Sequence, residues 1–158
     1  GLAVTLAADI AAVLDERITI VYGSHGPAGL AARRWKTQIN ENAKMPAFWG
    51  ELPELDHNEI EGWSALAGVT RRRTGVVFLR DPGEHPRVAR RADLTADLIG
   101  DETAVAGTVW AQGEDLLSRL FSLVAVGDLV SVEMAERTGV DPTPVERIQE
   151  LKRRLAEE

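Results

Sequence analysis

The chain has 158 residues, of which 44% are hydrophobic and 27% charged; its formal net charge is −7, and it contains no cysteine. This length suits one domain with a real hydrophobic core, and no apolar run approaches the ~18 residues that a membrane-spanning helix needs. The acidic charge argues against binding to nucleic acid or to an anionic membrane, and the missing cysteines exclude disulfides and thiolate metal sites.

The first third of the chain reads as helix, strand, turn and helix. Apolar residues from Leu2 to Leu14 recur at helical spacing. The pattern is already running at Gly1, with no initiator Met, so we expect an N-terminal partner domain to precede it. The run Ile18 to Tyr22 predicts a strand that ends in the glycine-rich turn Gly23 to Gly26. A helix from about Ala28 to Lys44 should follow and stop there, because a proline restricts the residue before it.

The middle of the chain has weaker patterns. Residues 46–56 contain two prolines and no clean period, which predicts a loop. Asp56 is placed to cap a short helix from His57 to Trp63. The polar stretch Ser64 to Gly75 contains three consecutive arginines, Arg71 to Arg73, and predicts an exposed loop with solvated charges.

The last part of the chain returns to clear alternation. Strands are predicted at Val76–Leu79 and Ala104–Trp110, with helices from about His85 to Ile99 and from Asp115 to Glu136. The second helix has an apolar face wider than a surface helix needs, which a second domain or subunit could bury. Alternating strands and helices predict a single α/β domain, a three-layer α/β/α sandwich with a mainly parallel sheet.

A final helix is predicted after residue 143. Thr143 as the cap, Pro144 at the first position and Glu146 at the third are typical of a helix start. The helix is expected to turn one apolar stripe inward, made of Val145, Ile148, Leu151 and Leu155.

The segment from Arg34 to Trp63 reads RWKTQINENAKMPAFWGELPELDHNEIEGW. It resembles the signature region of the bifunctional phosphoglucose/phosphomannose isomerase family. The resemblance continues in VVFLRDPGEHPRV, RLFSLVAVGDLVSVEMA and GVDPTPVERIQELKRRL, and so covers nearly the whole chain. It implies that residues 1–158 form the second, C-terminal sugar-isomerase (SIS) domain of a two-domain enzyme. That enzyme would interconvert glucose 6-phosphate or mannose 6-phosphate with fructose 6-phosphate through a cis-enediol(ate).

Such a reaction needs a proton donor at the ring oxygen and a base that moves a proton between C1 and C2. One carboxylate can take this proton and return it. Glu41 matches the family's catalytic base, His57 its ring-opening histidine, and Lys152 a lysine that contacts the substrate's hydroxyls or ring oxygen. In the family the histidine reaches the neighbouring subunit's active site, which implies a homodimer. Without the resemblance, Glu41 and Lys152 would read as solvated side chains, and His57 as a histidine at a helix start in a loop.

Further positions are less specific. Family members that accept both sugars have a threonine near the final helix, which helps to rotate the C2–C3 bond of the substrate. Thr143 lies close to that position in the sequence, although a role as helix cap would also explain it. Backbone amides at Gly23 and Ser24 could hold an anion. The resemblance implies a cytoplasmic enzyme without metal or other cofactor. It also places the phosphate-binding serines and threonines, and an enediolate-stabilising arginine, in the first SIS domain, so we expect this chain alone to be almost inactive.

Two other functions stay open from the sequence. One is a non-catalytic SIS module that binds or senses a sugar phosphate. The other is an isomerase-like protein whose activity is lost or changed. The joint presence of Glu41, His57 and Lys152 argues against pure sensing, which needs none of them chemically.

Overall fold

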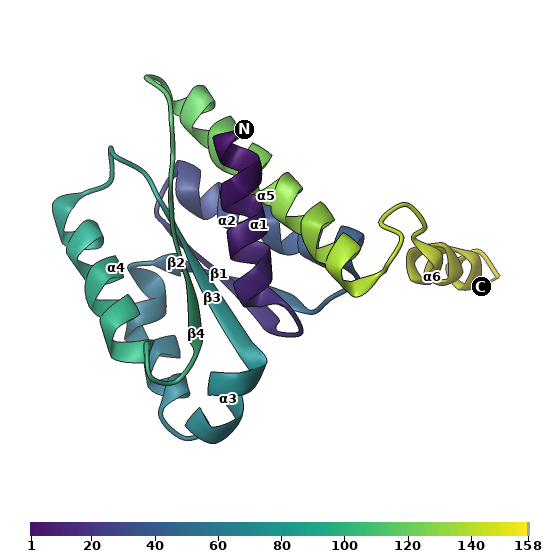
Figure 1. The fold of residues 1–158 in the computed structure, drawn as a ribbon, viewed down its shortest axis with the longest axis horizontal. Coiled ribbons are helices and arrows are strands. Elements are labelled where there is room, and N and C mark those ends of the chain that lie inside the picture. Colours follow the sequence, from purple (N-terminus) through teal and green to yellow (C-terminus); the bar gives the residue numbers. More distant parts are fainter. Residues whose placement is uncertain (158) are drawn as a thin grey trace.

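The computed structural model describes residues 1–157, which form a parallel sheet covered by helices on both faces (Figure 1). The strands are β1 (Ile18–Ser24), β2 (Ala47–Leu52), β3 (Thr74–Arg80) and β4 (Ala104–Trp110), in the sheet order β2-β1-β3-β4. All three neighbouring pairs run parallel. The α/β sandwich with a parallel sheet is therefore confirmed.

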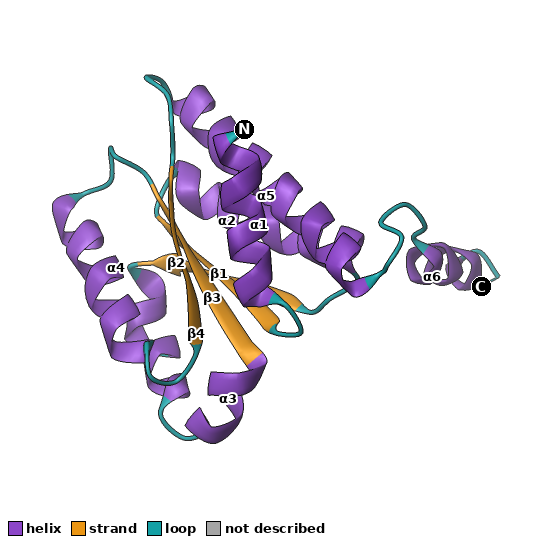
Figure 2. Cartoon of the chain, viewed as in Figure 1, coloured by secondary structure: helices purple, strands orange, loops and turns teal. Residues whose placement is uncertain are grey.

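The helices divide between the two faces of this sheet (Figure 2). They are α1 (Leu2–Leu14), α2 (Pro27–Gln38), α3 (Ala67–Arg73), α4 (Pro86–Ile99), α5 (Leu116–Thr138) and α6 (Glu146–Leu155). A π-helical turn, Ile39–Ala43, extends α2, and two 3-10 turns, Glu54–His57 and Glu59–Trp63, follow β2. Helices α1, α2 and α5 pack on one face, whereas α4 and the 3-10 turns pack on the other. Among residues 1–157, no helix is long and apolar enough to cross a membrane.

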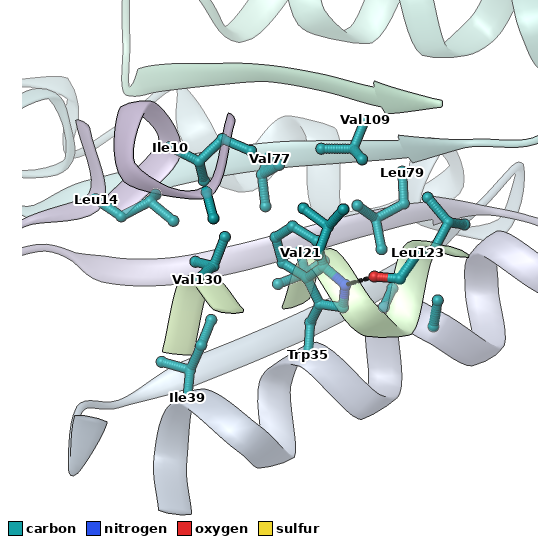
Figure 3. Close-up of a cluster of buried hydrophobic side chains, with 14 of the residues drawn as sticks. Ile10, Leu14, Val21, Trp35, Ile39, Val77, Leu79, Val109, Leu123 and Val130 are labelled. Atoms are coloured by element: carbon teal, nitrogen blue, oxygen red, sulfur yellow. Dashed lines mark hydrogen bonds between the residues drawn. The ribbon is translucent and has the colours of Figure 1, made fainter. Parts of the chain in front are cut away.

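The larger hydrophobic layer centres on Trp35 of α2, which is fully buried beside α5 (Figure 3). Its ring N–H donates a hydrogen bond to the carbonyl oxygen of Leu123, at 2.8 Å. A Cβ at Gly127 of α5 would lie only 2.2 Å from Trp35 Nε1. Because such a contact is impossible, α5 approaches α2 this closely only with glycine at residue 127.

The prediction of a loop over residues 46–56 was wrong, because residues 47–52 form β2. This strand lies at the edge of the sheet and pairs only with β1, Ala47 opposite Thr19 and Leu52 opposite Ser24. Its first and last residues are buried and the aromatic residues after the first are exposed, so its burial does not alternate. The strand is formed by pairing with β1, a long-range contact that a local pattern does not record.

The prediction of a loop over residues 64–75 was also wrong. Helix α3 occupies residues 67–73, and Arg71 to Arg73 form its last turn. Positive charge at this position is favourable, because it faces the negative end of the helix dipole. The arginines are exposed, as the sequence predicted.

Helix α6 extends away from the body of the molecule (Figure 1), and two predictions about it were wrong. Its N-cap is Val145, without a side-chain cap bond, so Thr143 does not cap it. None of its residues is buried, and Ile148, Leu151 and Leu155 are 43%, 58% and 61% exposed. The apolar stripe does not turn inward because no part of the described chain packs over it.

The wide apolar face of α5 is divided along its length. Leu123, Val130 and Met134 enter the core, whereas Leu117 and Phe121 near its start are 66% and 62% exposed. The described chain therefore accounts for only part of this face.

Candidate functional site

Glu41 lies on the π-helical turn that extends α2. Both neighbouring asparagines are held by side-chain hydrogen bonds. Asn42 Nδ2 donates to Ser131 Oγ of α5, and Asn40 Nδ2 donates to the carbonyl oxygen of Met45, both at 2.8 Å. The backbone on either side of Glu41 is thereby fixed, while Glu41 itself is exposed.

A pocket of about 390 Å³ opens beside this turn. One wall contains Asn40, Glu41 and Lys44. The opposite wall comes from the α5–α6 connection and the first residues of α6, namely Val140, Asp141, Pro144, Val145, Glu146, Arg147 and Ile148. Glu41 thus faces a pocket, as its predicted place at a helix end suggested.

Lys44 joins the two walls of this pocket. Its Nζ donates to the carbonyl oxygen of Glu41 at 2.6 Å and to that of Pro142 at 3.2 Å. In the second wall, Asp141 accepts a hydrogen bond from the backbone N–H of Thr143 at 2.9 Å, and this bond holds the pKa of the Asp141 carboxyl below its usual range. Sequence reasoning singled out neither Lys44 nor Asp141, and their only signal was their place within the segments that carry the family resemblance.

His57 lies beyond the other end of β2, in the first 3-10 turn. Its side chain is exposed and makes no hydrogen bond or ion pair within residues 1–157. The preceding residue is firmly bound, because the Asp56 carboxylate accepts a hydrogen bond from Thr95 Oγ1 at 2.8 Å and pairs with Arg91 Nη1 at 3.1 Å. The prediction that Asp56 caps a helix beginning at His57 was therefore wrong. The Asp56 carboxylate binds α4 instead, and Asn58 is the N-cap of the second turn.

The second 3-10 turn is fastened to β1 through Tyr22. The Tyr22 hydroxyl donates to Glu59 Oε1 at 2.6 Å and accepts from the ring N–H of Trp63 at 3.2 Å. Burial, and next the Glu59 carboxylate, raise the pKa of Tyr22 well above its usual range. His57 is thus an exposed side chain on a segment that is held at Asp56 and again at Glu59.

β2 separates Glu41 from His57. The turn with Glu41 precedes β2 and is bonded to α5, whereas the turn with His57 follows β2 and is bonded to α4, on the other face of the sheet (Figure 1). The six residues of β2 span roughly 20 Å. Glu41 and His57 therefore lie at opposite ends of β2, on turns that are bonded to different faces of the sheet.

Gly23 and Ser24 end β1, at the opposite end of α2 from Glu41. Gly23 has no room for a side chain, since a Cβ would lie 2.4 Å from the carbonyl oxygen of Ala28. Ser24 is fully buried, and its Oγ has no hydrogen-bond partner in the part of the chain that is described. This turn lies at the other end of α2 from the Glu41 pocket. The His25 N–H there donates to the carbonyl oxygen of Leu52 at 3.0 Å, and His25 Nδ1 lies 2.7 Å from Glu51 Oε1.

Thr143 and Lys152 lie on the same side of the molecule as Glu41. Thr143 is exposed in the α5–α6 connection, between the pocket-lining Asp141 and Pro144, and does not itself line the pocket. Lys152 is exposed on α6, one helical turn beyond the pocket-lining Ile148, and does not itself line the pocket. No group of three or more metal-binding side chains occurs within residues 1–157.

Comparison with known proteins identifies the family. Residues 3–155 match the family model described as bacterial phospho-glucose isomerase C-terminal SIS domain. The bifunctional phosphoglucose/phosphomannose isomerase of Caldicellulosiruptor bescii is 40% identical over 147 residues, which cover 91% of this chain and 42% of the relative. The enzyme of the same name from Aquifex aeolicus is 39% identical over 138 residues, covering 87% of this chain and 42% of the relative.

Among solved structures, a glucose-6-phosphate isomerase like protein from Thermus thermophilus has a similar fold, with a TM-score of 0.68 and 21% identity. The likeness covers 91% of this chain and 46% of that one. The chain spans less than half the length of the relatives that it matches. On the match from residue 3 to residue 155, the chain belongs to the family of bacterial phospho-glucose isomerase C-terminal SIS domains.

Proposed function

We propose that this chain supplies the proton-transfer part of an aldose–ketose isomerase that acts on glucose 6-phosphate or mannose 6-phosphate. The observation that carries the proposal is Glu41, an exposed carboxylate beside a pocket, on a turn that two hydrogen-bonded asparagines hold in place. The identity of 39–40% to two enzymes named bifunctional phosphoglucose/phosphomannose isomerase supports the substrate class.

In the proposed reaction, Glu41 removes the proton from C2 of the open-chain aldose. The electron pair of that C–H bond forms the C1–C2 double bond of a cis-enediol(ate), and the C1 oxygen gains negative charge or a proton. Glu41 then returns its proton to C1 while the C2 hydroxyl gives up its own proton, which ends on the C1 oxygen, so that C1 becomes the alcohol and C2 the carbonyl of the ketose. The oxidation of C2 and the reduction of C1 balance within the sugar, so this step needs no redox cofactor. Lys152 and Thr143 are proposed to contact the substrate's hydroxyl groups.

His57 is proposed to protonate the ring oxygen during ring opening, and to do so in a second copy of the chain. Its distance from Glu41 across β2 argues for this arrangement. The exposure of His57 on a segment held by hydrogen bonds supports it as well, because a partner can reach such a side chain without rearrangement. The proposed assembly is a homodimer in which each copy lends His57 to the other's pocket.

The substrate's phosphate is proposed to bind to an N-terminal SIS domain of a longer protein. The fact that the matched relatives are more than twice as long supports this. Gly23 and Ser24 remain a separate proposed anion site formed by backbone amides. The chain alone would then isomerise sugar phosphates negligibly, since it lacks the groups that anchor the phosphate.

The test is to measure isomerisation of both sugar phosphates by the full-length protein and by its Glu41→Gln variant. Glutamine keeps the shape of glutamate and removes the base, so we expect kcat to fall by roughly 10²–10⁴-fold while KM changes little. Glu136→Gln makes the same chemical change on α5, at an exposed residue that does not line the pocket, and should keep most of the activity. An unchanged kcat in Glu41→Gln would refute the proposal.

A further inference from the structure

The connection after α5 and helix α6 are attached to the rest of the chain in an unusual way. Within residues 1–157, one hydrogen bond joins residues 141–157 to any earlier residue, from Lys44 Nζ to the carbonyl oxygen of Pro142. No ion pair does so in the same range, and no residue of α6 is buried. The position of this wall of the pocket therefore depends strongly on one lysine side chain.

The backbone of Lys44 adds a second observation. Lys44 closes the π-helical turn in the left-handed conformation, with φ 57° and ψ 22°. This conformation favours glycine or asparagine, because a Cβ crowds the backbone there. A lysine at such a position is in an unfavourable backbone conformation. Its ammonium, however, makes two hydrogen bonds that glycine could not make.

The two bonds have a specific geometric consequence. The same Nζ donates to the carbonyl oxygen of Glu41 and to that of Pro142. It thus links the residue that bears the proposed base to the wall on the other side of the pocket. Asp141, next to Pro142, adds a negative charge that attracts the ammonium. A bond from a charged donor is stronger than one between neutral groups.

We propose that Lys44 is a positioning residue, which bridges the Glu41 turn and the α5–α6 connection and so holds α6 at the mouth of the pocket. The bridge itself is a property of the chain. Its importance for turnover rests on the proposed function, because Thr143 and Lys152 matter to catalysis only if this pocket is the isomerase site.

The bridge is tested by hydrogen–deuterium exchange of the chain, read at the amides of residues 141–150. In Lys44→Met and Lys44→Gly, exchange should become roughly tenfold faster or more, which corresponds to the loss of one hydrogen bond from a charged donor. Lys44→Arg keeps a cationic donor and should stay close to the wild type. Lys36→Met removes the same charge from α2, where the ammonium makes no hydrogen bond within the described residues, and should leave the exchange unchanged.

Lys44→Gly separates the side chain from the backbone, because glycine relieves the left-handed conformation while it removes the ammonium. Exchange at the wild-type rate in either Lys44→Gly or Lys44→Met would overturn the bridge. Exchange in β1 and β3 serves as the folding control and should not change in any variant.

The catalytic consequence is tested in the full-length protein. Lys44→Met and Lys44→Gly should lower kcat by roughly 10–10²-fold, the cost of a small misplacement at a reacting centre. KM should change less, and Lys44→Arg should recover most of kcat. Faster exchange with an unchanged kcat would overturn the catalytic part of the proposal. A wild-type protein that isomerises neither sugar phosphate would refute the proposed function, and the exchange result would still decide the bridge.

Discussion

The segment that carries His57 and the segment that faces Glu41 across its pocket are held by different kinds of contact. Around His57, Leu55 and Trp63 are 4% and 6% exposed, and buried polar groups of β1 and α4 bind the segment. Helix α6 has no buried residue and depends on Lys44. Core packing can present a side chain rigidly to a partner, whereas a helix without such packing takes its position from a few polar contacts or from another chain.

The largest expected effect comes from removing a core contact of the His57 segment. Trp63→Ala should lower the free energy of unfolding of the chain by about 3–5 kcal/mol, because it leaves a cavity beside Tyr22. Leu151→Ala on α6 should change that free energy by no more than about 0.5 kcal/mol, since Leu151 is exposed. Urea unfolding followed by circular dichroism measures both. Equal losses in the two variants would contradict the contrast.

A smaller loss is expected when only the polar attachment of the same segment is removed. Asp56→Ala leaves the Thr95 hydroxyl, on a residue that is 2% exposed, without its acceptor, so the loss in unfolding free energy should be about 1–3 kcal/mol. Asp56→Asn keeps an acceptor and should lose less. Glu54→Ala, two residues earlier and exposed, is the control. If Glu54→Ala lowers the free energy of unfolding as much as Asp56→Ala does, the hydrogen bonds from Asp56 to α4 do not hold the segment.

The contribution of the Tyr22 hydroxyl to the pH dependence of stability should appear only at alkaline pH. Its pKa is raised in the folded protein, whereas an unfolded tyrosine titrates near ~10. The folded state therefore holds this proton more tightly. The stability that results is fully present below pH ~10 and is lost as the pH rises above it. Since Tyr22 is the only tyrosine, tyrosinate absorbance reports on it alone.

We expect tyrosinate to appear near pH ~10 in denaturant, and in the native protein only as it unfolds at higher pH. Tyr22→Phe should remove this contribution to the pH dependence of stability. Tyrosinate near pH ~10 in a chain that keeps its native circular dichroism would show that Tyr22 is not held as described.

The sequence predicted correctly those helices and strands whose own apolar spacing marks their buried face. The helices from Leu2 and from Asp115, and the strands at β1, β3 and β4, all follow apolar spacing. β2 was missed because it is stabilised by pairing with β1, and its exposed Phe48 and Trp49 interrupt any alternation. The inward orientation of α6 was mispredicted for a related reason, because an amphipathic stripe does not specify what will cover it.

The candidate site was predictable only in part. The resemblance singled out Glu41 and His57, and the helix end before Pro46 placed Glu41 at a pocket. Lys44 was not predicted because its role depends on a left-handed backbone and on a carbonyl oxygen at residue 142, far along the chain. The separation of His57 from Glu41 also could not be read from a spacing of sixteen residues, since it required knowing that a strand lies between them.

The most direct test of this separation mixes two inactive variants of the full-length protein, Glu41→Gln and His57→Asn, carrying different affinity tags. Each variant alone should be nearly inactive. After dissociation and reassembly, hybrid dimers selected through both tags should each hold one intact site, so that an unselected equal mixture recovers about a quarter of wild-type activity. Hybrid dimers that form but stay inactive would contradict the account, because Glu41 and His57 would then not meet across two copies.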